Sequence, residues 1–255
     1  MEGISIIIPV YNKLEITLRC LEHIMKMNPK GQAEIIIVDN GSTDATPVIL
    51  SKRSDIAYIR SQENLGIAKA FNCAAEKATY DIFCFMHNDV FIYEQEWAAR
   101  LEGFIRTTTD AGLVGLYGAK MLRRDGSFRG WTIMHAIKNV PTIRNPFEKV
   151  AVVDGLLLAM RRQVFMDIGG FQESYTMHYY DKDISMRVWD RGYANYVLNM
   201  TFEHQSAATR KQISGEAMIR DKAREQFLEQ WEHKLPVDVT TFSEKLKHVF
   251  RIAPR

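Results

Sequence analysis

Residues 4–44 of this chain, ISIIIPVYNKLEITLRCLEHIMKMNPKGQAEIIIVDNGSTD, decide its fold. The β-branched runs at 4–9 and 34–39 predict two buried strands, because short continuous apolar runs are typical of strands that are covered on both faces. Residues 14–27 between them predict a helix. Its apolar side chains recur along one stripe: Leu14, Leu18, Leu21 and Met25. This order of elements predicts a layered α/β domain.

The same alternation continues to His87. Further strands are predicted at 56–60 and 81–87, and further helices at 45–52 and 67–77. The resulting order β-α-β-α-β-α-β predicts a mostly parallel central sheet flanked by helices. In such sheets ligands bind beyond the carboxyl ends of the strands, where loops converge and helix N-termini offer free N–H groups.

The composition is that of an ordinary globular protein. Hydrophobic residues make up 46% of the 255 residues, which is enough for a sizeable core. The formal net charge of +2 gives no global field that attracts nucleic acid, so no nucleic-acid partner is expected. Three cysteines without a CxxC pair favour reduced thiols. Since neither a signal sequence nor a stretch of about 20 apolar residues is seen, we expect a cytoplasmic protein.

Beyond residue 90 the pattern changes. Strand-like stretches are predicted at 112–118, 150–160 and 194–202. Helices are predicted at 161–171, 180–191 and 214–231, the first two because glycine closes each of them. A segment with mixed glycine, arginine and aromatic residues, 123–145, is interpreted as a mobile lid.

Polar side chains follow the predicted strands of the first half. Neither a G-x-G-x-x-G turn nor a phosphate-binding loop ending in Gly-Lys-Ser/Thr is present, so the sequence does not predict a glycine cradle for phosphate. Asp39 can accept a hydrogen bond from a base N–H, and Tyr11 can stack on the ring. The alternative for residues 39–44 is a helix cap, because Ser, Thr and Asp satisfy free helix N–H groups.

Carboxylates at two further places suggest chemistry. Asp89 ends an apolar strand and can bind a hard divalent cation, with His204 as a candidate nitrogen ligand. A simple turn is the alternative for Asp89. Asp181 and Asp183 begin a helix, where either carboxylate can act as a general base or as a cap. The helical period sends these two side chains in different directions, so only one is expected to face the cleft.

Together, these segments resemble the family 2 glycosyltransferases of the GT-A fold, particularly the bacterial rhamnosyltransferase-like branch that acts on surface polysaccharides. The resemblance covers residues 4–206, and it is carried by an ordered set of motifs. These are SIIIPVYNK at 5–13, IIIVDNGSTDAT at 35–46, ENLGIAKAFN at 63–72, MHNDV at 86–90, VDGLLLAMRRQVFMDIGGFQE at 153–173 and YDKDISMRVWDRGY at 180–193.

The resemblance implies an inverting, metal-dependent glycosyltransferase of the hexosyltransferase type. It would move a sugar from a nucleotide-diphosphate sugar to a glycan or lipid-linked glycan. Asp181 would be the catalytic base, and Asp89 and His204 would bind Mn²⁺ or Mg²⁺. Asp154 and Gly155 would line the sugar and acceptor side. The implied donor-binding residues are Pro9, Tyr11, Asp39, Ser42, Asn64, Gly66, Lys69 and Asn88.

Two positions depart from the family pattern. His87 stands where the family usually has Asp or Asn, and Tyr180 stands where it usually has Glu or Asp. Asp183 therefore remains an alternative base. A nucleotide-sugar-binding protein without turnover is the alternative function, for which these two departures would be signs of decay.

The resemblance also suggests how the chain is divided. Residues 1–210 would form the GT-A catalytic domain, with a nucleotide-binding half at 1–90 and an acceptor-side half at 91–210. Residues 211–255 would form a helical C-terminal extension. Within it, 242–255 is basic and amphipathic, which predicts either a peripheral contact with the inner face of the membrane or packing on protein.

Overall fold

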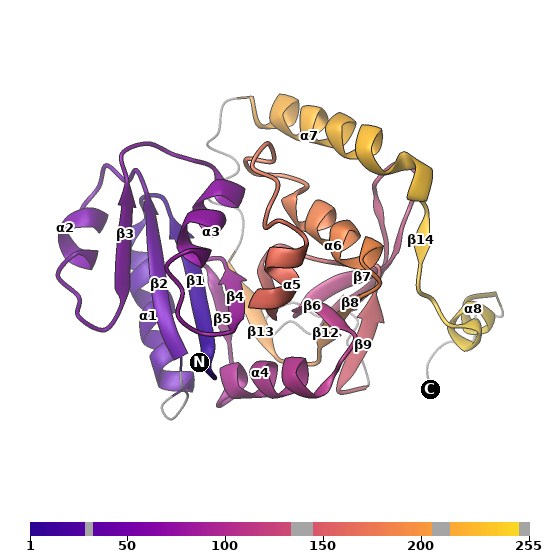
Figure 1. Ribbon diagram of the computed structural model, residues 1–255, viewed down its shortest axis with the longest axis horizontal. Helices are drawn as coiled ribbons and strands as arrows, with labels where there is room; N and C mark the ends of the chain where they lie inside the picture. Colours follow the sequence, from indigo (N-terminus) through magenta and orange to yellow (C-terminus); the bar gives the residue numbers. More distant parts are fainter. Residues whose placement is uncertain (29–32, 134–144, 206–214, 250–255) are drawn as a thin grey trace.

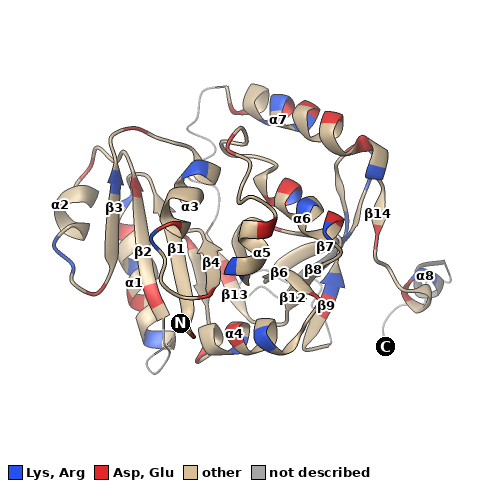
Figure 2. Cartoon of the chain, viewed as in Figure 1, with Lys and Arg blue, Asp and Glu red and all other residues tan. Residues whose placement is uncertain are grey.

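The structure, a computed structural model, describes residues 1–28, 33–133, 145–205 and 215–249 (Figure 1). An eight-stranded sheet forms its centre, with the strand order β3-β2-β1-β4-β11-β6-β12-β9. Helices cover both faces of this sheet. Basic and acidic residues are interspersed along the elements, and α7 carries both (Figure 2). No described helix is both long and apolar enough to cross a bilayer.

The first half matches the prediction from the sequence. The strands β1 (Ile4–Val10), β2 (Ala33–Asn40), β3 (Ala57–Ser61) and β4 (Ile82–Met86) pair in parallel. The helices α1 (Leu14–Met27), α2 (Thr46–Leu50) and α3 (Ile67–Ala75) connect them. Both faces of β1 are buried, since Ile6, Ile7 and Ile8 have no exposed surface. The apolar runs therefore indicated the central strands correctly.

The second half extends the sheet with mixed directions. The strand β11 (Leu157–Arg161) is antiparallel to both β4 and β6 (Ala111–Gly115). Beyond it, β12 (Ala194–Leu198) runs parallel to β6, and β9 (Phe147–Val150) forms the edge. The single strand predicted at 150–160 was wrong. It is divided among β9, β10 (Val152–Val153) and β11. β9 pairs with β12 whereas β10 pairs with β7 (Tyr117–Leu122) in another sheet, and between β10 and β11 the Asp154 carboxylate accepts a hydrogen bond from the Leu156 N–H and turns the chain.

The remaining helices pack around this sheet. They are α4 (Trp97–Thr107), α5 (Arg162–Asp167), α6 (Tyr180–Asp190) and α7 (Glu216–Trp231). The sequence predicted α5, α6 and α7 but not α4. Two further short pieces, η2 (Glu232–Lys234) and α8 (Phe242–Val249), lie in the C-terminal part.

Two small sheets complete the fold. One contains β10, β7 (Tyr117–Leu122), β8 (Phe128–Ile133) and β14 (Val237–Asp238). The other pairs β5 (Val90–Ile92) with β13 (Phe202–His204). The strand predicted at 194–202 is therefore two strands, β12 and the start of β13. Of the segment interpreted as a lid, 134–144 lies outside the described residues.

Candidate active site

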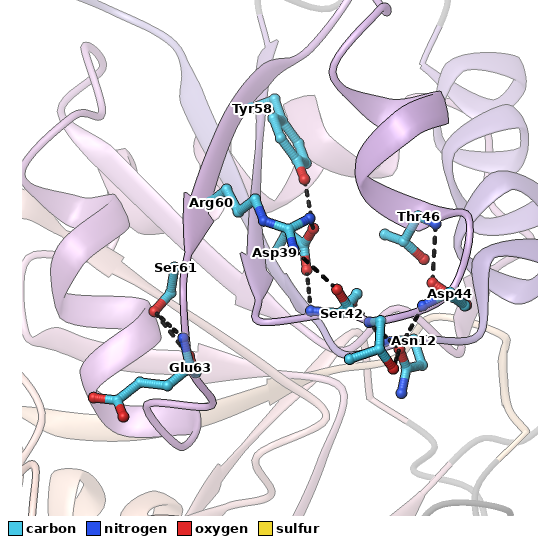
Figure 3. A network of polar contacts seen from close by, with 10 residues as sticks. Asn12, Asp39, Ser42, Asp44, Thr46, Tyr58, Arg60, Ser61 and Glu63 are labelled. Carbon is cyan, nitrogen blue, oxygen red and sulfur yellow. Dashed lines mark hydrogen bonds and ion pairs between the residues drawn. The ribbon is translucent and has the colours of Figure 1, made fainter.

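The loops that follow β1 and β2 are joined by hydrogen bonds (Figure 3). The Asn12 N–H donates to Ser42 Oγ over 2.7 Å, and the Thr43 N–H donates to Asn12 Oδ1 over 2.8 Å. Asp44 Oδ1 accepts from the Thr46 N–H over 2.9 Å just before α2, whose N-cap position is Ala45, so Asp44 stabilises the turn into the helix without capping it. Ser42, a predicted donor-binding residue, is buried within this network. Hydrogen bonds therefore hold the two loops together as one surface at the carboxyl end of the sheet.

Asp39 lies beneath that surface without solvent exposure. One oxygen accepts from the Ser42 N–H over 2.8 Å, and the other lies 2.5 Å from the Tyr58 hydroxyl and 3.2 Å from Arg60 Nη1. Burial, and then the hydrogen bond to Asp39, raise the pKa of Tyr58 to about 12. A contact between Asp39 and a nucleobase stays a prediction. The bonds around Asp39 favour an indirect role for it.

Arg60 was missed by the sequence reasoning. It lies opposite Asp39 in the parallel pairing of β2 with β3. Its Nη2 donates to the Ser42 carbonyl oxygen over 3.1 Å, while 42% of its side chain is exposed. The signal that could have revealed it is a cation near the carboxyl end of a strand beside Asp39.

The loop before α3 has its own network. Asn64 Oδ1 accepts from Asn40 Nδ2 and from the Gly66 N–H, each over 3.0 Å. Gly66 has a φ of +78°, and a Cβ there would lie 2.9 Å from the Thr176 carbonyl oxygen. A side chain at Gly66 is thus opposed by both backbone strain and contact. Among the other predicted donor residues, Pro9 lies in β1, and Tyr11 and Lys69 are exposed.

A metal site is suggested at the end of β4. The antiparallel pairing of β5 with β13 sets His204 opposite Val90, and the Gln205 N–H donates to the Asp89 carbonyl oxygen over 2.9 Å. Asp89 Oδ1 and His204 Nε2 are consequently 3.2 Å apart. His87 joins this pair, since one ligand atom from each of the three residues lies within 4.8 Å of the others.

The electrostatics of Asp89 suit a cation. Burial alone would raise the pKa of its carboxyl group, but the contact with His204 and the charges of His204 and His87 lower it below its ordinary value. Asp89 Oδ1 is buried, and His204 Nε2 lies 3.2 Å from it. A buried carboxylate oxygen beside imidazole nitrogens is a ligand set that fits a divalent cation such as Mn²⁺.

The predicted base, Asp181, lies in the first turn of α6. Its Oδ2 accepts from the Gly155 N–H over 3.3 Å, and its Oδ1 accepts from the Lys182 N–H over 2.9 Å. The side chain is partly exposed and so can meet a substrate. It faces the turn that also holds Asp154, the other residue predicted on the acceptor side.

Asp183, the alternative base, is excluded from the site by its position. It is fully buried, and its carboxylate bonds Arg187 Nε over 2.9 Å and Trp231 Nε1 over 3.0 Å. Burial raises its pKa. Asp183 therefore anchors α7 on α6, and the helical period separates it from Asp181 as predicted.

Two neighbouring residues have structural roles. Asn88, predicted to bind the donor, donates from Nδ2 to Thr17 Oγ1 on α1 over 2.8 Å, so its amide faces the helix. Lys182 donates to the Gly126 carbonyl oxygen over 2.7 Å, and its Nζ lies 3.9 Å from the ring centre of Tyr179. Burial lowers the pKa of Lys182. This contact holds the turn between β7 and β8, the described beginning of the supposed lid, against α6.

Tyr180 was not predicted to belong to the site. Its hydroxyl lies 2.8 Å from His87 Nε2 and donates to the Gly155 carbonyl oxygen over 3.2 Å. The His87 N–H donates to the Leu156 carbonyl oxygen over 3.1 Å. Thus the turn at 154–156 connects the candidate metal ligands with the start of α6, which carries Asp181.

The chain is similar to known proteins in sequence and in fold. Residues 5–169 match the family described as glycosyl transferase family 2. The chain is 29% identical over 215 residues to Glycosyltransferase AglE of Haloferax volcanii, a match that covers 79% of this chain and 64% of AglE.

Solved structures share the fold. One is GalNAc-T7 with UDP, GalNAc and Mn²⁺, with a TM-score of 0.66 and 13% identity over 98% of this chain and 55% of that one. Another is mannosyltransferase PcManGT from Pyrobaculum calidifontis with GDP-Man and Mn²⁺, with a TM-score of 0.60 and 18% identity over 82% and 59%. The predicted GT-A fold is confirmed. The chain spans less than two thirds of the length of AglE and of both these structures.

Proposed function

Because the chain belongs to glycosyl transferase family 2, we propose that it transfers a hexosyl group, with inversion, from a nucleotide-diphosphate sugar to an acceptor hydroxyl. The observation that carries this proposal is the buried Asp89 oxygen, which follows β4, lies 3.2 Å from His204 Nε2 and forms one cluster with His204 and His87. A cation held by these two residues would neutralise the departing nucleoside diphosphate. AglE, a similar protein by sequence, bears the name glycosyltransferase, and two proteins of similar fold hold Mn²⁺ with UDP or GDP-Man.

Asp181 supplies the base in this proposal. The acceptor oxygen attacks the anomeric carbon while the bond from that carbon to the diphosphate oxygen breaks. Asp181 takes the acceptor proton on a carboxylate oxygen. The Gly155 N–H orients the carboxylate through its bond to Oδ2. A single displacement of this kind inverts the anomeric centre, and it needs no second carboxylate as a covalent nucleophile.

In this proposal each half of the chain binds a different substrate. Residues 1–90 would bind the nucleotide, with Tyr11 and Arg60 offering an exposed ring and an exposed guanidinium beside the buried Asp39. Residues 91–210 would bind the acceptor, a glycan or lipid-linked glycan. The extension at 211–255 and the rhamnosyltransferase-like branch remain predictions. So does a cytoplasmic location, which cell fractionation would test.

Asp89→Ala tests the proposal. Titration calorimetry with UDP or GDP, with and without Mn²⁺, is expected to show that the variant loses the metal-dependent part of its affinity, by about 10-fold or more. Asp55→Ala is the matched control, because Asp55 is a half-exposed carboxylate paired with Arg53. Equal metal dependence in wild type and Asp89→Ala would refute the metal assignment.

Turnover distinguishes the alternative function. The full chain with Mn²⁺ and a panel of UDP-, dTDP- and GDP-sugars is expected to release nucleoside diphosphate from at least one donor. Thermal shift on the same panel would identify the donor, since a ligand that binds the folded state raises its stability. A stabilising donor that is never turned over, with or without glycan acceptors, would favour a binding protein without catalysis.

A further inference from the structure

The two positions that depart from the family pattern contact each other. His87 and Tyr180 are 93 residues apart in the chain, yet His87 Nε2 and Tyr180 Oη are 2.8 Å apart. The tyrosine is buried, and its ring packs against those of Phe71 and Phe171 at centroid distances of 6.3 Å and 6.1 Å. Gly155 makes room for this arrangement, because a Cβ there would lie 2.1 Å from Tyr180 Oη.

The hydrogen bonds of Tyr180 set the tautomer of His87. A tyrosine hydroxyl has a single proton, and that of Tyr180 is directed to the Gly155 carbonyl oxygen. Because a carbonyl oxygen cannot donate, both contacts of Tyr180 Oη are hydrogen bonds only when Oη accepts from His87 Nε2–H. A neutral imidazole protonated on Nε2 carries its lone pair on Nδ1. Proteins commonly prepare a histidine for metal binding through such a hydrogen bond to the other ring nitrogen.

His87 lies where such a lone pair is useful. One ring nitrogen of His87 falls within 4.8 Å of ligand atoms of Asp89 and His204, and its ring centroid is 5.8 Å from that of His204. The hydrogen bond from its backbone N–H to the Leu156 carbonyl oxygen fixes the main chain. Backbone and side chain are thus both held before any cation arrives.

We propose that His87 is a third protein ligand of the cation and that Tyr180 is the residue that positions it. This inference rests on the proposed metal site and extends it. Two imidazoles and one carboxylate favour Mn²⁺, Co²⁺ or Zn²⁺ over Mg²⁺, which prefers oxygen ligands. The chain should consequently bind Mn²⁺ without a nucleotide, whereas a site of one or two protein ligands depends on the diphosphate to complete it.

The test uses the metal alone. Free Mn²⁺ is measured by electron paramagnetic resonance in titrations of the full chain without nucleotide, for wild type, Tyr180→Phe and His87→Asn. Both variants are expected to bind Mn²⁺ about 10- to 100-fold more weakly. Tyr175→Phe is the matched control, since Tyr175 is also fully buried and its hydroxyl makes no hydrogen bond. The control should bind within twofold of wild type.

The outcomes separate this inference from the proposed function. Wild-type Mn²⁺ affinity in His87→Asn overturns the third ligand, whatever Tyr180→Phe does, and leaves Asp89 and His204 as the metal pair. Unchanged affinity in Tyr180→Phe alone overturns the positioning role. Retention of binding in Asp89→Ala instead refutes the proposed metal site itself. If Tyr180→Phe does not fold, the Co²⁺ absorption spectra of wild type and His87→Asn give the decision, and identical spectra overturn the inference.

Discussion

Gly155→Ala probes the contact between the turn at 154–156 and α6 by adding one methyl group. The new Cβ would lie 2.1 Å from Oη, 2.5 Å from Cζ and 3.0 Å from Cε2 of Tyr180. Gly155 does not have a left-handed φ, so alanine causes no backbone strain there. The variant is therefore destabilised only by steric overlap with Tyr180, and the tyrosine ring must move.

The magnitude follows from these contacts. Forcing an extra methyl group into a packed core costs about 1–3 kcal/mol. Displacing the hydroxyl of Tyr180 also breaks its bonds to His87 and Gly155, which contribute about 1 kcal/mol each. Alanine offsets about 0.4–1 kcal/mol of this loss, because it restricts the conformations of the unfolded chain more than glycine does. We expect the free energy of unfolding to fall by about 2–5 kcal/mol.

Urea unfolding followed by circular dichroism measures this change. Gly103→Ala is the control, because Gly103 is an exposed residue of α4 and a Cβ there would have no atom within 4 Å. It should stabilise the protein by about 0.5–1 kcal/mol, the ordinary gain of alanine over glycine in a helix. A change below about 0.5 kcal/mol in Gly155→Ala, comparable to that of an ordinary surface substitution, would refute the packing argument.

Three further predictions concern other parts of the molecule. Glu34 accepts from Ser5 and from the Thr79 N–H, each over 2.6 Å, and these bonds outweigh burial to lower its pKa below 4.5. Because such stability is present above the ordinary pKa and lost as the pH falls through the lower folded value, Glu34→Gln should lose about 1–3 kcal/mol at pH 7. In urea titrations the deficit should shrink below pH 4.5, and a constant deficit would contradict the assignment. Asp181→Asn is expected to keep donor affinity in calorimetry but to lose about 10²- to 10⁴-fold in kcat, and wild-type turnover would reject the base. A chain that ends at Thr241 should lose co-sedimentation with anionic vesicles at low salt yet keep turnover of a soluble acceptor, whereas unfolding would assign 242–255 to packing.

The C-terminal segment shows why composition alone was ambiguous. Its stripe and basic residues fit a membrane surface and a protein surface equally well. In the described part, Glu244 forms an ion pair with Lys120, and Lys245 lies 2.9 Å from Asp238 in β14. These pairs connect the first turn of α8 with the small sheet, and each contributes about 1 kcal/mol at most because the groups are partly exposed. The membrane contact remains a prediction.

Local pattern predicted the first half of the fold because its elements are specified within short windows. Isoleucine runs fix the central strands, and a single apolar stripe fixes α1. The helix α4 was missed although Trp97 and Leu101 are buried. It begins after Glu96 in a left-handed conformation and without a side-chain cap, so the usual signal for a helix start is absent. The pairing of β5 with β13 depends on segments more than 100 residues apart, which no local window contains.

The same difference between local and long-range patterns decides which residues of the candidate site could be predicted. Asp89 and Asp181 were predicted because each lies in a motif or at the end of an element, whereas Arg60 depends on the register between two strands. The sequence reasoning treated the departures at His87 and Tyr180 as independent. The alternative of a binding protein without turnover explains both of them as loss of catalytic residues. Independent decay at two positions gives no reason for a hydrogen-bonded pair beside a glycine that leaves room for the hydroxyl. Their contact is 2.8 Å long, and a ring nitrogen of His87 lies within 4.8 Å of ligand atoms of Asp89 and His204. This arrangement favours a metal site in which His87 replaces the usual residue, and so favours the enzyme.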